Sequence, residues 1–125
     1  MITFFEKHNK LSWIITILGA ILIFYLSSIP FAPGKFATSS RSIIYHFVAF
    51  FLLAGFLLIS SLKGKINTKI FSLSFGLLIL YGILDELHQF FVPGRFCTLF
   101  DVGIDTAGIL LASGIYFFRL RFNSR

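Results

Sequence analysis

Long apolar runs dominate the chain, and most charged residues are confined to the short segments between them. Two runs, 11–29 and 42–62, contain no charged residue. A third run, 70–92, is interrupted by Asp85 and Glu86, and the only charges of a fourth, 101–118, are Asp101 and Asp105. A helix needs about 20 residues to cross the ~30 Å hydrocarbon core of a bilayer. We therefore predict four transmembrane helices at about 11–29, 42–62, 70–92 and 101–118.

Turn-forming residues separate these runs, as expected for connections between helices. They are Pro30 and Pro33-Gly34 after the first run, Lys63-Gly64-Lys65 after the second and Pro93-Gly94 after the third. The first run follows two lysines, as the apolar part of a signal peptide would. It is longer than the usual 7–15 residues of such a part. We expect an uncleaved helix.

The composition supports a membrane protein. Of the 125 residues 57% are hydrophobic and 18 are Phe, while only 13% are charged, against roughly 25% in an average globular domain. The mean hydropathy is +0.90. A soluble domain of this size cannot bury so much apolar surface. We predict one all-α membrane domain over residues 1–125, a four-helix transmembrane bundle. Its single cysteine, Cys97, excludes an internal disulfide, and we expect it to act as a small apolar filler.

The basic residues indicate topology. The formal net charge is +6, but no contiguous basic stripe is present, so we expect no nucleic-acid partner. Eight of the 11 Lys and Arg residues lie in the two terminal tails and the middle loop, and the other three are Lys35, Arg41 and Arg95. The positive-inside rule then predicts that both termini are cytoplasmic. The expected surrounding partner is the lipid bilayer.

Four of the five acidic residues lie close together in sequence, inside or beside the third and fourth runs: Asp85, Glu86, Asp101 and Asp105. An ionised carboxylate in hydrocarbon costs at least a few kcal/mol, so such groups persist only when they are paired, hydrated or used. Under the predicted topology these acids lie near the outer face of the membrane. We expect the function to involve this region.

Helical spacing predicts which of these side chains face the bundle interior. Asp85, His88 and Gln89 are spaced i, i+3, i+4 and share a helix face, whereas Glu86 points about 100° away from Asp85. In the fourth run, Asp101, Asp105, Gly108 and Ala112 form one stripe of acidic and small residues. Small residues allow close helix approach in lipid. We therefore expect that stripe to pack against the third run and to bring the two sets of acids together.

His46 and Arg95 are predicted at the same depth as the acids. His46 is either a hydrogen-bonded structural residue or a functional partner of the carboxylates. Arg95 either compensates the charge of Glu86 or Asp101, or holds an anion, because a guanidinium binds phosphate or carboxylate in a fork. Asp, Glu and His would suit Mg²⁺, Mn²⁺ or Zn²⁺. Their spacing matches no standard metal motif, and we assign no metal ligand from the sequence.

These motifs resemble the VanZ-like family. The segments that carry the resemblance are Asp85-Glu86-x-His88-Gln89 through Pro93-Gly94-Arg95, Asp101-x-x-x-Asp105-x-x-Gly108, His46-Phe47, and Ser27-Ser28-Ile29-Pro30. The family often has Asp-Lys before this His and Tyr after it, but the chain reads Ser42-Ile43-Ile44-Tyr45 before it and has Phe50 after it. The resemblance implies a four-helix inner-membrane protein of the cell envelope. The family takes its name from a protein that gives low-level resistance to the glycopeptide teicoplanin, which does not by itself imply antibiotic resistance for this chain.

The main functional hypothesis is an outward-facing polar pocket that binds or modifies an envelope component, such as a lipid-linked molecule. Its ligand-binding candidates are Arg95, Gln89, Asp101 and Asp105. If the protein is an enzyme, Glu86 or Asp85 would be the base, with His46 or His88 as its partner. Two alternatives stay open: a non-catalytic scaffold whose acids lock the helices in register, and a subunit of a proton-coupled transporter. The sequence specifies no cofactor, reaction or oligomeric state.

Overall fold

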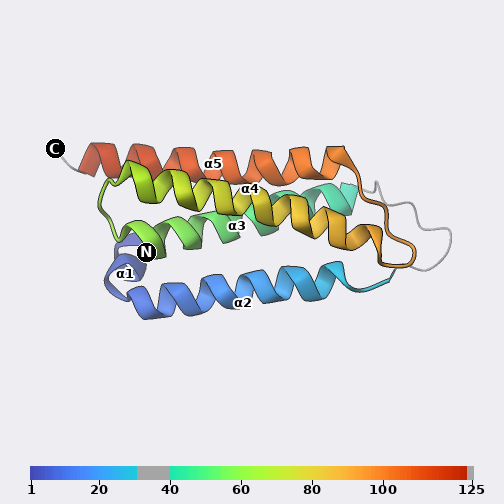
Figure 1. The fold of residues 1–125 in the computed structure, drawn as a ribbon. Coiled ribbons are helices and arrows are strands. Elements are labelled where there is room, and N and C mark those ends of the chain that lie inside the picture. The colour runs from blue at the N-terminus through green and yellow to red at the C-terminus, as the bar shows by residue number, and fades with distance from the viewer. Residues whose placement is uncertain (31–39, 124–125) are drawn as a thin grey trace.

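The computed structural model describes residues 1–30 and 40–123, and within them the chain is helical (Figure 1). The helices are α1 (Ile2–Lys7), α2 (Asn9–Ser27), α3 (Ser40–Leu62), α4 (Thr68–Phe90) and α5 (Leu99–Asn123). Helices α2, α3, α4 and α5 are each long and apolar enough to cross a membrane. The predicted Pro33-Gly34 break, Lys35 and Arg125 lie outside the described residues.

Each long helix begins slightly before its predicted start, and α5 ends beyond its predicted end. The prediction followed the apolar runs, whereas helical hydrogen bonding continues past the edge of the hydrocarbon. Lys10, Lys69 and Arg121 therefore lie inside helices, in terminal turns from which a long side chain can reach water. Helix α4 begins at a side-chain cap, in which the Asn67 carbonyl oxygen accepts the Ile70 amide at 3.1 Å. The short helix α1 was not predicted.

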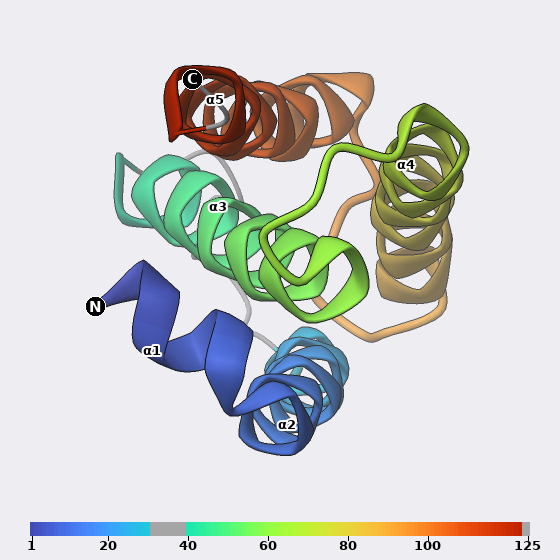
Figure 2. The ribbon, with the colours of Figure 1, turned by 90° about the vertical axis from the view of Figure 1, so that its left-hand side faces the viewer.

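Helix α3 lies at the centre of the bundle. It contacts each of the other four helices, and the end-on view shows it between α2 and α5 (Figure 2). The N- and C-termini lie at the same end of the bundle (Figure 1). We call this the terminal end, and the opposite end, where α2 and α4 finish and α3 and α5 begin, the far end.

A glycine in α5 allows α3 and α5 to approach closely. A Cβ atom added to Gly108 would lie 2.5 Å from the main-chain oxygen of Phe47 and 3.0 Å from the main-chain nitrogen of Phe51. The stripe of Asp105, Gly108 and Ala112 is buried, as predicted. Its expected partner, α4, was right for only part of the stripe: Asp105 lies against Gly82 of α4, whereas Gly108 packs on the backbone of α3. Spacing along one helix identifies the packed face, but it cannot identify which neighbour covers that face.

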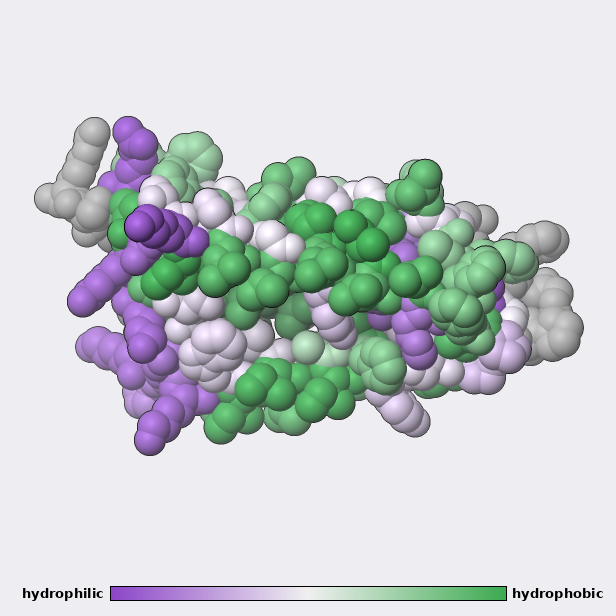
Figure 3. All heavy atoms as spheres, in the orientation of Figure 1, coloured by the Kyte–Doolittle hydropathy of each residue, from purple (hydrophilic) through white to green (hydrophobic). Residues whose placement is uncertain are grey.

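The outside of the bundle is apolar. Many large side chains are at least half exposed, among them Leu73, Leu77, Leu110 and Phe118, and green apolar residues cover the middle of the molecule (Figure 3). Hydrophilic residues gather at the terminal end in the same view. This distribution is that of a helix bundle surrounded by lipid. The buried core, which includes Phe50, Leu58 and Ile109, is small by comparison.

Candidate functional site

A buried group of polar side chains occupies the far end of the bundle. We call it the acidic cluster. Its members are 1–3% exposed and come from three helices: His46 of α3, Asp85, Glu86 and Gln89 of α4, and Asp101 and Asp105 of α5. The four predicted acids thus lie in one place, together with His46. Among the ligand-binding candidates, Gln89, Asp101 and Asp105 are members, and Arg95 borders the cluster.

His46 joins α3 to both acidic helices. Its Nδ1 atom lies 2.9 Å from Oδ1 of Asp105 and 3.7 Å from Oε1 of Glu86. A histidine held by one carboxylate has a defined ring orientation and tautomer, which is the arrangement used for proton transfer and for metal binding. The Asp105 side chain also packs on α4, because a Cβ atom added to Gly82 would lie in ordinary contact with the Asp105 carboxylate, at 3.6 Å.

Gln89 connects the two acids of α4. Its Nε2 atom donates to Oδ2 of Asp85 at 3.0 Å and lies 3.4 Å from Oε1 of Glu86. The same amide lies 3.5 Å from the Ser27 hydroxyl at the end of α2. Asp85 and Glu86 therefore converge on one amide, although they are adjacent residues about 100° apart on the helix.

Arg95 closes the far end of the bundle by binding α2. A turn positions it, in which the Arg95 amide donates to the Val92 carbonyl at 3.1 Å and Gly94 adopts a φ of 76°, as a type II Pro-Gly turn requires. Its guanidinium donates to Oε1 of Gln89 at 3.2 Å and to the main-chain oxygens of Leu26 at 2.7 Å and Ile29 at 2.9 Å. Burial lowers the pKa of Arg95 from its usual value, and this outweighs the opposing effect of nearby carboxylates.

Asp101 belongs to a helix cap. The Thr98 hydroxyl donates to Oδ2 of Asp101 at 2.6 Å and accepts the Asp101 amide at 3.1 Å. The Thr98 amide in turn donates to Oε2 of Glu86 at 3.2 Å. Thr98 was missed as a contributor to the site. The sequence pattern that could have identified Thr98 is a capping box, in which a Thr is followed three residues later by an acid at the start of an apolar run.

The other candidates lie apart from the cluster. His88 stacks on Phe24, with ring centroids 4.5 Å apart, and its Nε2 atom lies 2.9 Å from the Ser28 hydroxyl. It therefore fixes α4 against α2 and has no place beside Asp85. Cys97 is exposed, so the expectation that it fills space in the apolar core was wrong. Partial burial and the nearby Glu86 and Asp101 carboxylates raise the pKa of its thiol, which disfavours the reactive thiolate.

Three buried oxygens near the far end have no hydrogen-bond partner among the described residues: Oδ1 of Asp85, Oδ2 of Asp105 and the Tyr45 hydroxyl. Buried polar atoms are nearly always hydrogen-bonded, and an orphaned one costs about 1–3 kcal/mol. Tyr45 directly precedes His46 on α3, and Asp85, Arg95 and Asp105 all act electrostatically on its hydroxyl. These oxygens are available to a ligand.

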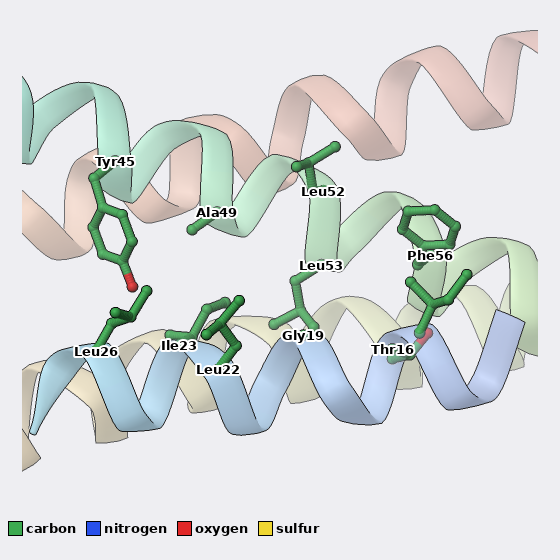
Figure 4. Close-up of a pocket in the computed structure, with 11 residues that line it drawn as sticks. Thr16, Gly19, Leu22, Ile23, Leu26, Tyr45, Ala49, Leu52, Leu53 and Phe56 are labelled. Carbon is green, nitrogen blue, oxygen red and sulfur yellow. The ribbon is translucent and has the colours of Figure 1, made fainter.

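An apolar groove runs between α2 and α3 and ends at Tyr45 (Figure 4). Its volume is about 220 Å³. Small residues on both helices, Gly19 and Ala49, leave space between them, and the lining also includes Leu22 and Leu52, whose side chains are half exposed at the bundle surface. The groove therefore opens sideways, towards the surrounding lipid. At its far end the Tyr45 ring extends from α3 towards Leu26 of α2 (Figure 4).

Comparison with known proteins identifies the family. The family model described as VanZ/LLP1 matches residues 4–120, nearly the whole chain, and the chain therefore belongs to that family. Neither a search of curated proteins nor a search of solved structures found a match.

Proposed function

We propose that this VanZ/LLP1 membrane protein binds a lipid-linked molecule of the cell envelope. In this proposal the hydrocarbon chain lies in the groove between α2 and α3, and the polar head lies at the far end beside Tyr45 and Arg95. The observation that carries it is the position of Tyr45. This residue ends the apolar groove and also borders the acidic cluster, and its buried hydroxyl has no partner among the described residues.

The shape and chemistry of the groove suit a lipid chain. Among the described residues that line it, Thr16 and Tyr45 are the only ones with a side-chain oxygen, and the Thr16 hydroxyl is already bonded to the Ser12 carbonyl at 2.8 Å. A groove that opens into a bilayer is filled by hydrocarbon without desolvating any polar group, so the hydrocarbon chain binds without a polar penalty. Selectivity would then come from the head group, where Tyr45 can donate one hydrogen bond.

The proposed orientation places that head group on the outer side of the membrane. Both termini share the terminal end (Figure 1), and the exposed lysines Lys7, Lys10, Lys63 and Lys65 belong to the helices and the loop at that end. The positive-inside rule assigns such an end to the cytoplasm. The acidic cluster then faces the envelope, where lipid-linked precursors are used.

If binding leads to chemistry, His46 is the residue we propose for proton transfer. Among Glu86, Asp85, His46 and His88, it alone combines an imidazole with a carboxylate at 2.9 Å that orients the ring. Glu86 would be its second partner, at 3.7 Å. His88 is not part of this proposal, because Ser28 and Phe24 hold it outside the cluster.

Photo-crosslinking tests the lipid proposal. The probes are a photoactivatable polyprenyl phosphate and, for comparison, a photoactivatable phosphatidylglycerol, added to the purified protein in nanodiscs. We expect the polyprenyl probe to label α2 and α3 at residues that line the groove, and Ala49→Phe to abolish the labelling by filling the groove. Ala107→Phe is the matched control, since Ala107 is an exposed alanine on α5, away from the groove.

Equal labelling of wild type and Ala49→Phe would contradict the proposal. If both lipids label the wild type equally and neither labels Ala49→Phe, the groove is a general lipid site. That outcome would contradict selectivity for a lipid-linked precursor. If neither probe labels the groove, the cluster is better explained as a lock that fixes the helices in register.

A further inference from the structure

The acidic cluster brings together the donor atoms of a metal site. One nitrogen of His46 and one oxygen each of Asp85 and Glu86 lie within 4.8 Å of one another, and all three side chains are buried. Asp105 adds a fourth donor, because its Oδ1 atom is 2.9 Å from Nδ1 of His46. These four residues come from three different helices, and their spacing in sequence follows no metal motif.

The distances fit a single small ion. Nitrogen and oxygen ligands lie about 2.0–2.2 Å from a zinc-sized cation, so two neighbouring ligands of one ion are roughly 3–3.5 Å apart. Nδ1 of His46 lies at 2.9 Å from its Asp105 neighbour and at 3.7 Å from Oε1 of Glu86. The donor atoms of His46, Asp85 and Glu86 lie within 4.8 Å of one another. Closing such a separation to about 3.5 Å requires the two side chains together to move by up to about 1.3 Å, which changes of their side-chain torsions allow.

Buried oxygens without a hydrogen-bond partner are a second, independent indication of a cation site. Oδ1 of Asp85 and Oδ2 of Asp105 have no hydrogen-bond partner among the described residues, and their side chains are 3% and 1% exposed. Asp85 is also directed into the group, since its other oxygen shares the Gln89 amide with Glu86. A cation would satisfy both free oxygens and would balance three carboxylates that are otherwise forced together in a medium of low polarity.

We propose that His46, Asp85, Glu86 and Asp105 bind one divalent transition-metal cation of the Mn²⁺ or Zn²⁺ type. One imidazole together with carboxylates favours these ions over Ca²⁺, which prefers oxygen ligands alone. Supporting residues are already in place. Gln89 holds Asp85 and Glu86, and the Thr98 amide holds Oε2 of Glu86 at 3.2 Å. Such supporting hydrogen bonds orient the ligands of metal sites.

The site is independent of lipid binding and is tested separately. With a cation bound, His46 would be a ligand, and this role would replace the proton transfer proposed above. Tag-free full-length protein is purified in detergent, stripped with EDTA and titrated with Mn²⁺, Zn²⁺ or Mg²⁺ while bound metal is measured by calorimetry and mass spectrometry. We expect one Mn²⁺ or Zn²⁺ per chain and much weaker Mg²⁺ binding. Electron spin-echo spectroscopy of the Mn²⁺ form should show coupling to one imidazole nitrogen.

Matched variants distinguish loss of the metal site from loss of the folded protein. We expect His46→Gln to remove the nitrogen coupling and to weaken Mn²⁺ binding by more than the roughly 10–100-fold that loss of a supporting residue costs. His88→Gln is the control, because it removes a histidine at the same end of the bundle but outside the cluster. If His46→Gln does not fold, Asp85→Asn keeps the side-chain shape and should still weaken binding.

Two results would overturn the proposal: no stoichiometric transition metal in the wild type, or equal loss of binding in His88→Gln and His46→Gln. In the first case, protons on His46 or on the carboxylates would balance the charge instead. Neither result bears on crosslinking of lipid in the groove, so the two proposals fail separately.

Discussion

At the scale of single residues, the polar side chains at the far end act as connectors between helices. Gln89 bonds both acids of α4 and accepts from Arg95, and Arg95 binds main-chain oxygens at the end of α2. The Leu26 carbonyl also accepts the Ile29 amide at 3.3 Å, so the guanidinium adds a second hydrogen bond there and a further one to the Ile29 carbonyl just beyond the helix. From the sequence, two roles were predicted for Arg95: charge compensation of a carboxylate, or binding of an anion. The capping of α2 is a third role, which depends on the tertiary contact.

The fifth acidic residue, Glu6, forms a second polar contact at the terminal end. Its carboxylate accepts from Arg119 at 2.5 and 3.2 Å and from the Tyr116 hydroxyl at 2.8 Å, which ties α1 to α5. The Tyr116 oxygen also accepts the Gly64 amide at 3.2 Å. Burial by itself would raise the pKa of Glu6, but the hydrogen bonds from Arg119 and Tyr116 outweigh it, and the pKa lies below its usual value of 4.5.

We predict that Glu6 stabilises the protein at neutral pH and loses this effect in acid. Because its pKa is lower when folded, its contribution is fully present above the unfolded value of 4.5 and disappears as the pH falls through the folded value. Glu6→Gln should lower stability by about 1–2 kcal/mol at pH 7 and by progressively less below pH 4.5. Thermal unfolding in detergent between pH 7 and pH 3 measures the difference. A difference in stability between wild type and Glu6→Gln that stays constant over this pH range would contradict the prediction.

At the scale of the elements, close helix contact depends on where small residues lie. Gly108 and Gly103 belong to the same helix, yet their surroundings differ. A Cβ atom on Gly108 would meet the backbone of α3 at 2.5 Å, whereas one on Gly103 would meet nothing within 4 Å. A backbone cannot move aside as a flexible side chain can, so substitution at Gly108 must separate α3 from α5. That same contact places Asp105 beside His46.

We predict opposite effects for two glycine substitutions in α5. Gly108→Ala should destabilise the bundle by about 1–3 kcal/mol, because the new methyl group overlaps the Phe47 carbonyl. Gly103→Ala, the matched control, should be neutral or stabilising by up to about 1 kcal/mol through its higher helix propensity. Melting temperatures in detergent compare the two variants. If Gly108→Ala is as stable as Gly103→Ala, the close approach of α3 and α5 is wrong.

At the scale of the whole molecule, an even number of membrane-spanning helices places both termini at one end. The exposed connection 91–98 then lies on the other side, together with Cys97. The natural cysteine is therefore a reporter of topology that needs no substitution. Its raised thiol pKa slows its reaction with maleimides, which labelling at mildly alkaline pH overcomes.

We predict that a membrane-impermeant maleimide labels Cys97 in intact spheroplasts. In a Cys97→Ser/Asn123→Cys protein the same reagent should label only after the membrane is permeabilised, because the C-terminal end of α5 is expected in the cytoplasm. The single variant Cys97→Ser controls for background. The reverse pattern would invert the topology and would place the acidic cluster at the cytoplasmic face.

Some properties of this protein follow from the sequence by itself. The thickness of a bilayer limits the length of each apolar run, so the number of spans, their bounds to within a few residues and the common depth of the four acids could be predicted. The VanZ-like motif was also recognisable, because it lies in local segments. The α5 stripe was correctly predicted to be buried, since helical periodicity identifies a packed face without knowledge of its partner.

Only the tertiary structure decided which side chains meet. Helical spacing placed His88 beside Asp85, but the crossing of α2 and α4 turns His88 towards Ser28, and the position of α3 brings His46 to Asp105 instead. The groove that ends at Tyr45 likewise forms only where α2 and α3 lie side by side, with Gly19 and Ala49 among the residues that line it. The physical reason is that a lipid-exposed helix presents apolar side chains on all its faces. Its neighbours are then selected by shape and by a few hydrogen bonds, neither of which appears in the pattern along the chain.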